Sequence, residues 1–372
     1  MGLQRIVLTW VATGRGGAER SIEEVAEYLA RFGMDVAVVW WRHGDGPAYL
    51  GTRPGVDVRQ VADLAGYRAQ LAAVMGDGHG TVLVSTQRTV LVDLHHAGAA
   101  PVLAVVHGII QPDHPLRVID PNSGGLVEYP PGSWPWDRLH RVARWVGISE
   151  ASAASIRQAA PPGTPVEVIL NGLTVPAVHP ERAPRGPVLR VAAVARAVPW
   201  KRLDHIIAAL AHPLLTGRSR LDVYGAEDSA HLQRLADELG VPFTCHGYVD
   251  ELSEHLSRAD VLAGAVLVEG FGRCVVDAAG GGTPSVMPNA GACPEVVLDG
   301  ITGLLYDPAD PDGLAHALYW AAETDPGELA AMGQAARHRA LAWFTPGRCA
   351  TEYLHLAYEV SNQARALVGA GA

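Results

Sequence analysis

Two acidic residues stand where carboxylates could act on a ligand. The run DVLAGAVLV predicts a strand over residues 260–268 with Glu269 at its end, and Asp277 stands eight residues later in EGFGRCVVDAAGGG. A carboxylate at the end of a buried strand needs a partner, because burial without one is costly. A helix predicted from about Arg273 to Ala279 puts Asp277 about 7 Å along its axis. The spacing predicts that Glu269 reaches the reacting end of an elongated ligand and Asp277 a hydroxyl group further back; two ordinary surface acids are the alternative.

A pair of cations follows another predicted strand. In VAAVARAVPWKRLDHII the strand ends near Ala195, and Arg196 and Lys201 lie in the loop after it. Lys201 is the single lysine among 29 basic residues, so a compact ammonium group stands where the chain otherwise uses arginine. Two cations in one strand-end loop predict a diphosphate-binding site. The alternative is that both are solvated surface charges, as Arg and Lys usually are.

A third candidate lies after the first predicted strand, in ATGRGGAER. Gly14, Gly16 and Gly17 allow close backbone approach, and a helix that starts near Ala18 would direct its N–H groups at a phosphate. The dinucleotide pattern GxGxxG is not completed, because Glu19 stands where the third glycine is required, and the second strand lacks the acid expected after it. The sequence therefore argues against a nicotinamide-dependent dehydrogenase, and a tight turn without a ligand stays open.

Short apolar runs alternate with helix-period segments, and this alternation places the three loops at strand ends. It predicts an α/β fold with parallel sheets covered on both faces. Residues 173–188, with four prolines, interrupt it as a linker. We expect two doubly wound, Rossmann-like domains that face an interdomain cleft, where ligands bind at the carboxyl ends of strands. The predicted parts are domains at residues 1–172 and 189–340, and C-terminal helices at 341–372 that pack back across the junction.

The composition favours a globular protein and excludes several classes. Hydrophobic residues make up 48% and charged residues 18%, and the formal net charge of −10 argues against nucleic-acid binding. No stretch reaches the ~20 apolar residues of a membrane span, and the first residues read as a strand rather than a signal peptide. Four cysteines without metal-ligand spacing predict reduced thiols in a cytoplasmic protein. No metal site is expected, and the oligomeric state is not indicated.

The motifs together resemble those of the retaining glycosyltransferases of family 4, which have the GT-B fold. In the second half the resemblance rests on RAVPWK, YGAED, HGYVDE and EGFGRCVVDAAGGGTPSVMPNAGACPEVV, in the right order and with the right gaps. In the first half GRGGAERSIEEVAEYLARFG, VVHG, VGISEA and ILNGL match smaller landmarks. The resemblance implies an acceptor-side first domain, a second domain that binds a nucleoside-diphosphate sugar of UDP or GDP type, and sugar transfer.

The resemblance also implies a role for each matching residue. Arg196 and Lys201 would bind the donor diphosphate, Glu269 would contact the donor sugar, and His107 would lie near that sugar as the fourth catalytic residue. The remaining donor-side positions match the family's phosphate loop, base region, sugar-hydroxyl loop and ribose-binding acid: Gly16, Gly17, Tyr248, Val249, Phe271, Gly272 and Asp277. The family has glutamate where Asp277 stands, so the ribose contact would depend on a side chain one methylene shorter.

The chemistry that the resemblance implies needs neither a cofactor nor a metal. Bond breaking builds negative charge on the departing diphosphate, and the cations Arg196 and Lys201 would stabilise it. Enzymes of this family use a same-face displacement in which the departing phosphate oxygen helps to deprotonate the acceptor. Glu269 would position the sugar rather than attack it.

The acceptor is the part that the sequence determines least. The segment that follows His107 is rich in proline, glycine and aromatic residues, and we interpret it as an acceptor-side lid, with an ordinary surface loop as the alternative. Its candidate contacts are His114, Tyr129, Trp134 and Trp136. The helix-like stretch LAGYRAQLAAVMGDGH carries one arginine, so it lacks the basic face of membrane-associated relatives. A soluble, small polar acceptor, as in natural-product glycosylation, is favoured.

Two other function classes stay open. A sugar-nucleotide epimerase or hydrolase on the same fold would use the donor site without an acceptor. A non-catalytic partner subunit would keep the fold and lose the charges, and the presence of Glu269, Arg196 and Lys201 counts against it.

Overall fold

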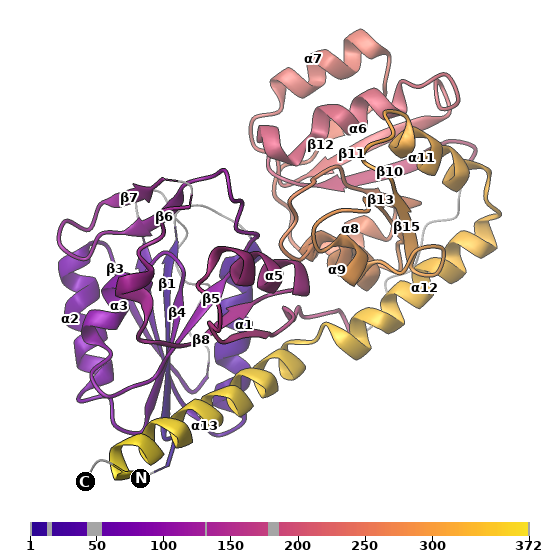
Figure 1. The fold of residues 1–372 in the computed structure, drawn as a ribbon. Helices are drawn as coiled ribbons and strands as arrows, with labels where there is room; N and C mark the ends of the chain where they lie inside the picture. The colour runs from indigo at the N-terminus through magenta and orange to yellow at the C-terminus, as the bar shows by residue number, and fades with distance from the viewer. Residues whose placement is uncertain (1, 13–16, 43–53, 131, 178–185, 371–372) are drawn as a thin grey trace. The chain divides into compact units, whose positions relative to one another are not determined.

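The chain folds into two compact units (Figure 1). The computed structural model describes residues 2–12, 17–42, 54–130, 132–177 and 186–370. The first unit comprises Met1–Leu173 together with Thr345–Ala372, and the second comprises Thr174–Phe344. The second unit is therefore an insertion in the sequence of the first. Part of the predicted linker, residues 178–185, lies outside the described residues.

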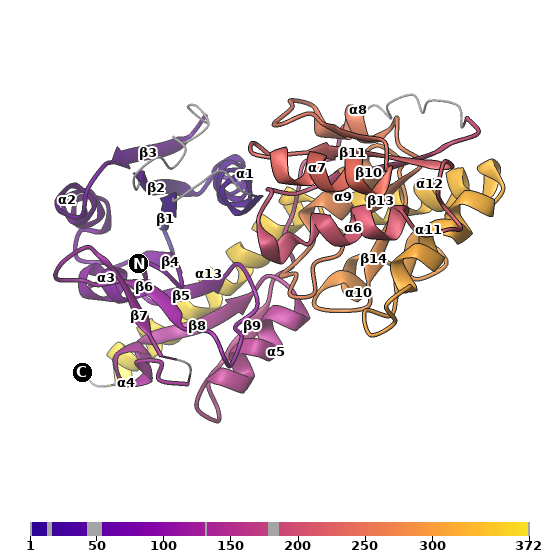
Figure 2. The ribbon, with the colours of Figure 1, turned by 90° about the horizontal axis from the view of Figure 1, so that it is seen from above.

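The first unit is built on a parallel sheet of seven strands in the order β3-β2-β1-β4-β5-β8-β9, which can be followed in Figure 2. Its strands are β1 (Arg5–Ala12), β2 (Asp35–Arg42), β3 (Val56–Val61), β4 (Thr81–Thr86), β5 (Val102–Val106), β8 (Val142–Gly147) and β9 (Val166–Val168). The central strands are buried on both faces, as the apolar runs predict. β6 (Leu116–Ile119) and β7 (Leu126–Tyr129) form a separate antiparallel hairpin.

Helices cover both faces of this sheet. α2 (Leu64–Met75) and α3 (Val90–His96) contribute to a core with the strand side chains that point to their side. α1 (Gly17–Arg31) packs against β1, β2 and α13 (Pro346–Ala370), and α13 also contacts β4. α5 (Glu150–Ala159) packs against β8 and β9, and α4 (Trp136–Leu139) is a single short turn before β8.

The chain leaves the first unit and returns to it at one place. A Cβ on Gly172 would lie directly against the backbone of Thr345 and Pro346, so only glycine fits where the two segments touch. Arg348 in the first turn of α13 donates a hydrogen bond to the carbonyl oxygen of Leu170 at 2.6 Å. These contacts hold the outgoing and the returning segment together within the first unit.

The second unit contains a parallel sheet of six strands in the order β12-β11-β10-β13-β14-β15. The strands are β10 (Leu189–Val194), β11 (Ser219–Tyr224), β12 (Phe243–Cys245), β13 (Val261–Ala263), β14 (Ser285–Pro288) and β15 (Gly303–Tyr306). The order reverses between β10 and β13, which is the doubly wound arrangement of nucleotide-binding sheets. The predicted class of two doubly wound α/β domains is confirmed.

Helices lie on both sides of the second sheet as well. α6 (Leu203–Leu210), α7 (Ala230–Leu239) and α11 (Gly313–Glu323) supply apolar side chains to its core. α8 (Leu252–Leu256) packs against α9 (Arg273–Gly280), which also packs against α12 (Pro326–Trp343). Figure 1 shows α6 and α7 on the opposite side of the sheet from α8 and α9. α10 (Cys293–Val296) is a short helix between β14 and β15.

Candidate donor-binding site

The centre of the candidate site is an ion pair in the second unit. Nζ of Lys201 lies 2.9 Å from Oε2 of Glu269, and the two side chains are 27% and 16% exposed. The other carboxylate oxygen, Oε1, accepts a hydrogen bond from the backbone N–H of Gly272 at 3.3 Å. Glu269 therefore joins the single lysine of the chain to the first residue of the turn that opens α9.

A stiff loop presents Lys201. The N–H groups of Val198, Lys201 and Arg202 donate to the carbonyl oxygens of Arg196, Val198 and Pro199 at 2.8, 2.9 and 3.0 Å. The segment Pro199–Lys201 is a 3-10 turn with proline at its start. Arg202, which follows it, has a left-handed backbone with φ of 50° and begins α6. Such a conformation is costly for a residue with a Cβ, so the fold around Lys201 holds this backbone under strain.

Glu269 is placed by a loop and not by a strand. The sequence predicts a strand that runs to Val268, but β13 ends at Ala263, and this prediction is wrong. Leu267 and Val268 are 38% and 41% exposed, so the apolar run leaves the sheet before it reaches the acid. An apolar run of this length cannot be assigned to a strand by periodicity alone.

A glycine that sequence reasoning missed supports this loop. The N–H of Ala292 donates to the carbonyl oxygen of Glu269 at 2.9 Å. Gly291 before it has φ of +55°, and a Cβ there would lie 2.7 Å from that oxygen and 2.8 Å from the nitrogen of Glu269. The signal was available, because Gly291 stands in the quoted motif NAGACPE.

The electrostatics keep the lysine charged. Burial is the largest influence and lowers the pKa of Lys201, but the charge of Glu269 and the hydrogen bond to it raise the pKa overall. The pKa values of two thiols nearby are raised as well, but there burial and the charge of Glu269 act in the same direction: the pKa of Cys274 rises to about 12, and that of Cys293 also rises. At neutral pH the site thus holds an ammonium group and two neutral thiols, which are poor nucleophiles.

The helix after Glu269 carries the second acid. Gly272, the residue directly before α9, has φ of 89°, a conformation that favours glycine. Phe271 is buried as a whole residue, with its ring 5.5 Å from that of Phe344, so its side chain belongs to the core rather than to the surface of the site. Asp277 is half-buried in the helix, and its carbonyl oxygen accepts a hydrogen bond from Oγ of Ser253 at 3.0 Å.

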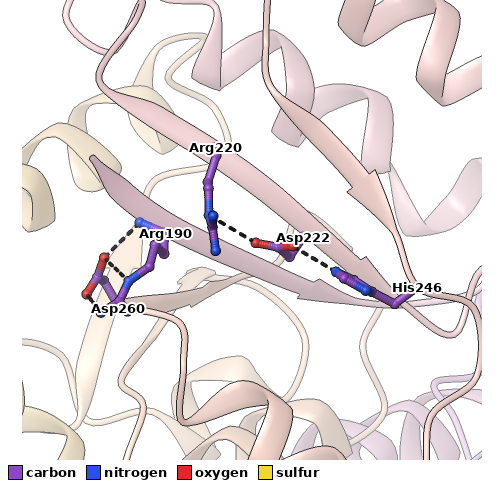
Figure 3. A network of polar contacts seen from close by, with 5 residues as sticks. All are labelled: Arg190, Arg220, Asp222, His246 and Asp260. Carbon is purple, nitrogen blue, oxygen red and sulfur yellow. Dashed lines mark hydrogen bonds and ion pairs between the residues drawn. The ribbon is translucent and has the colours of Figure 1, made fainter. Parts of the chain in front are cut away.

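The predicted base-contact residues follow β12. Tyr248 is 41% exposed and Val249 is half-buried. Next to them in sequence, His246 lies 2.8 Å from Oδ1 of Asp222 and stacks on Tyr224 with ring centroids 4.7 Å apart. Figure 3 shows His246 and Arg220 on either side of Asp222. This network was not predicted, and it fixes the residue from which the Gly247–Val249 turn starts.

A separate ion pair in Figure 3 joins two neighbouring strand segments. Oδ1 of Asp260 lies 2.8 Å from a guanidinium nitrogen of Arg190, and Oδ2 accepts a hydrogen bond from the Arg190 N–H at 2.8 Å. Asp260 is 2% exposed. The pair ties β10 to the residue that precedes β13, and so it helps to hold the two strands whose carboxyl ends lead to Lys201 and Glu269.

The remaining predicted catalytic and phosphate-loop residues belong to the first unit. His107 follows β5, and its ring meets that of Trp10 edge-on at 5.1 Å. Gly17 is the first residue of α1 and is exposed. Gly16, together with Gly14, lies outside the described residues.

The predicted acceptor residues divide into two kinds. His114 is exposed and contacts Asp113, and Tyr129 accepts a hydrogen bond from Arg138 at 3.2 Å. The rings of Trp134 and Trp136 stack 5.2 Å apart and pack against Trp145 in the core of the first unit. The segment is thus not a simple loop, since it contains the hairpin β6–β7 and two tryptophans that anchor it to the core.

The described residues contain neither a metal-binding cluster nor a membrane-spanning helix. No group of three or more His, Cys, Asp and Glu side chains there is arranged to hold a metal ion. Within the same ranges, every helix is too short or too polar to cross a lipid bilayer.

Comparison with known proteins agrees with this architecture. Residues 188–324 match the family described as Glycosyl transferases group 1. A solved structure of Anabaena HepE in complex with UDP and glucose matches the fold with a TM-score of 0.74 and 19% identity, over 95% of this chain and 99% of that one. The chain has the GT-B fold.

Curated relatives of this GT-B chain include mannosyltransferases. It is 38% identical over 182 residues to a GDP-mannose-dependent alpha-(1-6)-phosphatidylinositol monomannoside mannosyltransferase of Mycolicibacterium smegmatis, over 44% of this chain and 47% of that protein. It is 31% identical over 268 residues to an MMP alpha-(1->4)-mannosyltransferase of Mycolicibacterium hassiacum, over 66% of this chain and 62% of that protein. The chain thus spans between 47% and 62% of the length of these two relatives.

Proposed function

We propose that this chain is a retaining, metal-independent glycosyltransferase of family 4 that moves a sugar from a nucleoside-diphosphate sugar to a hydroxyl group. The observation that carries the proposal is the contact of 2.9 Å between Lys201 and Glu269 at the start of α9. This contact places the cation that would bind the diphosphate next to the acid that would bind the sugar. Activation of the donor requires both of these groups.

The diphosphate would be bound by positive charge from three sources. Lys201 remains an ammonium group at neutral pH, because Glu269 raises its pKa despite the opposing effect of burial. Arg196 is exposed in the same loop, and the N-terminus of α9 adds a partial positive charge. Together they stabilise the negative charge that develops on the departing diphosphate, which is the role of a divalent cation in other transferases.

Sugar transfer proceeds on one face of the donor. The bond between the anomeric carbon and the diphosphate oxygen breaks, and the acceptor oxygen bonds to the same face of that carbon. The departing phosphate oxygen takes the acceptor proton, so no protein base is consumed. Glu269 accepts hydrogen bonds from sugar hydroxyls and its charge favours the oxocarbenium character of the transition state.

The nucleoside would bind beyond the helix start. Asp277 accepts hydrogen bonds from the ribose hydroxyls, and the turn that holds Tyr248 and Val249 receives the base. The name of the relative from Mycolicibacterium smegmatis specifies GDP-mannose, whereas the HepE structure contains UDP. Both nucleotides are therefore candidates.

The acceptor is proposed to be a small polyhydroxylated molecule. The proteins similar to this chain include a D-inositol 3-phosphate glycosyltransferase of Geodermatophilus obscurus, 32% identical over 140 residues, as well as the mannosyltransferase whose name specifies a phosphatidylinositol mannoside. Inositol phosphates and short mannosides share the chemistry of clustered hydroxyl groups. Turnover measured with soluble and with lipid-linked forms of each acceptor distinguishes the two sources of these hydroxyl groups.

Calorimetry with GDP, UDP and ADP tests the donor site. We expect one of the three to bind in the presence of EDTA and to raise the melting temperature. Lys201→Ala should weaken that binding at least tenfold, whereas Arg218→Ala, which removes an exposed cation from the same unit, should leave it unchanged. Absence of binding by all three nucleotides, or equal binding by both variants, would contradict the proposal.

Turnover assays then separate the reaction classes. Transfer to inositol phosphates or mannosides, with retained anomeric configuration measured by NMR, is the expected result. Consumption of the donor at the same rate without an acceptor would instead indicate a hydrolase or an epimerase.

A further inference from the structure

Trp200 is an exposed aromatic residue beside the candidate donor site, and the proposed function leaves it without a role. Its side chain is 59% exposed, which is unusual for a large indole ring. It stands between Pro199 and Lys201 in the 3-10 turn. Because consecutive side chains of such a turn point about 120° apart, Trp200 and Lys201 address different neighbours: Lys201 contacts Glu269 and Trp200 does not.

The neighbour of Trp200 is Arg196. The central carbon of the Arg196 guanidinium lies 5.9 Å from the centroid of the Trp200 ring, within the range of a cation–π contact. Arg196 is exposed, and over the described part of the chain it forms no ion pair with a carboxylate. Hydrogen bonds join the backbone of Arg196, Val198 and Lys201, so the backbone from which the two side chains extend is fixed.

The charges in the loop do not by themselves hold the Arg196 side chain in place, so the contact with the Trp200 ring is what orients it. The charge of Lys201 is matched by Glu269, and among the described residues no second carboxylate pairs with Arg196. The positive charge of Arg196 also acts against that of Lys201. Without a partner, a long and flexible side chain with this charge would spend its time in solvent, away from the lysine.

We propose that Trp200 is a positioning residue that holds the Arg196 guanidinium beside Lys201 for the donor diphosphate. The ring face attracts the cation without neutralising it, so the full charge of Arg196 remains available to the phosphate oxygens. A carboxylate in this place would also hold the arginine, but together with the Lys201–Glu269 pair it would leave the loop without a net positive charge for the anion. This inference rests on the proposed function, because it assumes a diphosphate as the ligand.

The test compares variants by calorimetric titration with whichever of GDP and UDP binds the parent chain more tightly. Trp200→Leu should weaken diphosphate binding about two- to fivefold, as expected for loss of an exposed cation–π contact. Trp200→Phe keeps a ring face and should recover most of the affinity. Trp320→Leu is the matched control: Trp320 is 44% exposed in α11, and no described cation lies over its ring.

A double-mutant cycle shows whether Trp200 acts through Arg196. In an Arg196→Gln background the change Trp200→Leu should have no further effect, because the group that the ring positions is gone. The free nucleoside of the same base should bind the parent and Trp200→Leu equally, since it carries no phosphate. Additive losses in the cycle, or an equal loss with the nucleoside, would show that Trp200 contacts the ligand directly and would overturn the inference.

The outcomes also distinguish this inference from the proposed function. If Arg196→Gln and Lys201→Ala bind the diphosphate as the parent does, the assignment of the donor site fails. If Arg196→Gln weakens binding while Trp200→Leu does not, the donor site stands and the positioning role of Trp200 is wrong.

Discussion

Replacing Lys201 by methionine keeps the aliphatic part of the side chain and removes the ammonium group. Oε2 of Glu269 then loses its partner at 2.9 Å, and the carboxylate keeps the Gly272 N–H at 3.3 Å. The side chain of Glu269 is only 16% exposed, so water replaces the lost contact incompletely. We therefore expect Lys201→Met to destabilise the second unit as well as to weaken donor binding.

The size of the effect lies between the two limits known for ion pairs. Exposed pairs contribute about 0.2–1 kcal/mol, and loss of one partner of a fully buried pair costs about 3–5 kcal/mol. Because the two side chains are 27% and 16% exposed, the pair belongs between these cases. We expect Lys201→Met to lower the free energy of unfolding by about 2 kcal/mol. Adding Glu269→Gln should restore part of that loss, which corresponds to a coupling of about 1–2 kcal/mol.

Urea unfolding, followed by circular dichroism, measures the four free energies of this cycle. The matched control is the same cycle on Arg218 and Glu323, which pair on the surface of the second unit with 50% and 48% exposure. Its coupling should stay below about 0.5 kcal/mol. Equal couplings in the two cycles would refute the argument from burial.

The pH dependence gives a second check on the same pair. Burial lowers the pKa of Lys201, but Glu269 raises it overall. A group whose pKa is raised by folding adds stability below its unfolded pKa and loses that contribution as the pH rises through the folded value. The coupling should therefore be constant near neutral pH and fall above about pH 10, the ordinary value for lysine. A coupling that declined between pH 7 and pH 9 would contradict the direction of the shift.

Three further changes test features around the two units. Gly291→Ala should cost about 2 kcal/mol of stability and weaken donor binding, since its Cβ would lie 2.7 Å from the carbonyl oxygen of Glu269. The control is Gly300→Ala: Gly300 has φ of +70° and open space around it, so this change should cost only about 1 kcal/mol. Glu251→Gly should leave stability unchanged or raise it by up to about 1 kcal/mol, because Glu251 has φ of 50°, and a clear loss in thermal unfolding would argue against that strain. Asp93 is fully buried with hydrogen bonds from Thr9, Ser85 and Tyr67, and burial raises its pKa. Its charged form is disfavoured in the folded state, so the parent should lose stability relative to Asp93→Asn as the pH rises above the unfolded value of about 3.9; parallel stability curves from pH 3 to pH 7 would contradict this.

The sequence predicted the architecture well where apolar runs and helix periods are long. β1, β2, β4 and β5 lie where the apolar runs put them, because strands buried on both faces leave a continuous apolar pattern. The pattern failed after Ala263, where apolar side chains leave the sheet and become exposed. It also missed the β6–β7 hairpin, although the turn sequence DPNSGG between the two strands is a hairpin signal.

The candidate site was predicted in part. Residue type and the position after an apolar run were enough to single out Lys201 and Glu269, although Glu269 does not lie at a strand end, and the structure brings these two side chains into contact. The supporting residues were beyond such reasoning, because their roles depend on contacts between segments far apart in sequence. Gly291 supports Glu269 across a loop, and Asp222 meets His246 from a neighbouring strand. Neither of these two pairs can be predicted without knowing which segments of the chain are neighbours in the fold.

The junction at Gly172 has a consequence for biosynthesis. The ribosome makes the first unit's sheet early, but α13, which packs against α1 and β4, emerges only after the whole inserted unit. The inserted unit has all its strands in one continuous stretch, so it can reach its final topology while the earlier sheet still waits for its last helix. A released chain that ends at Phe344 contains all of the inserted unit but lacks α13, so it should resist protease in its later half and be cut in its earlier half.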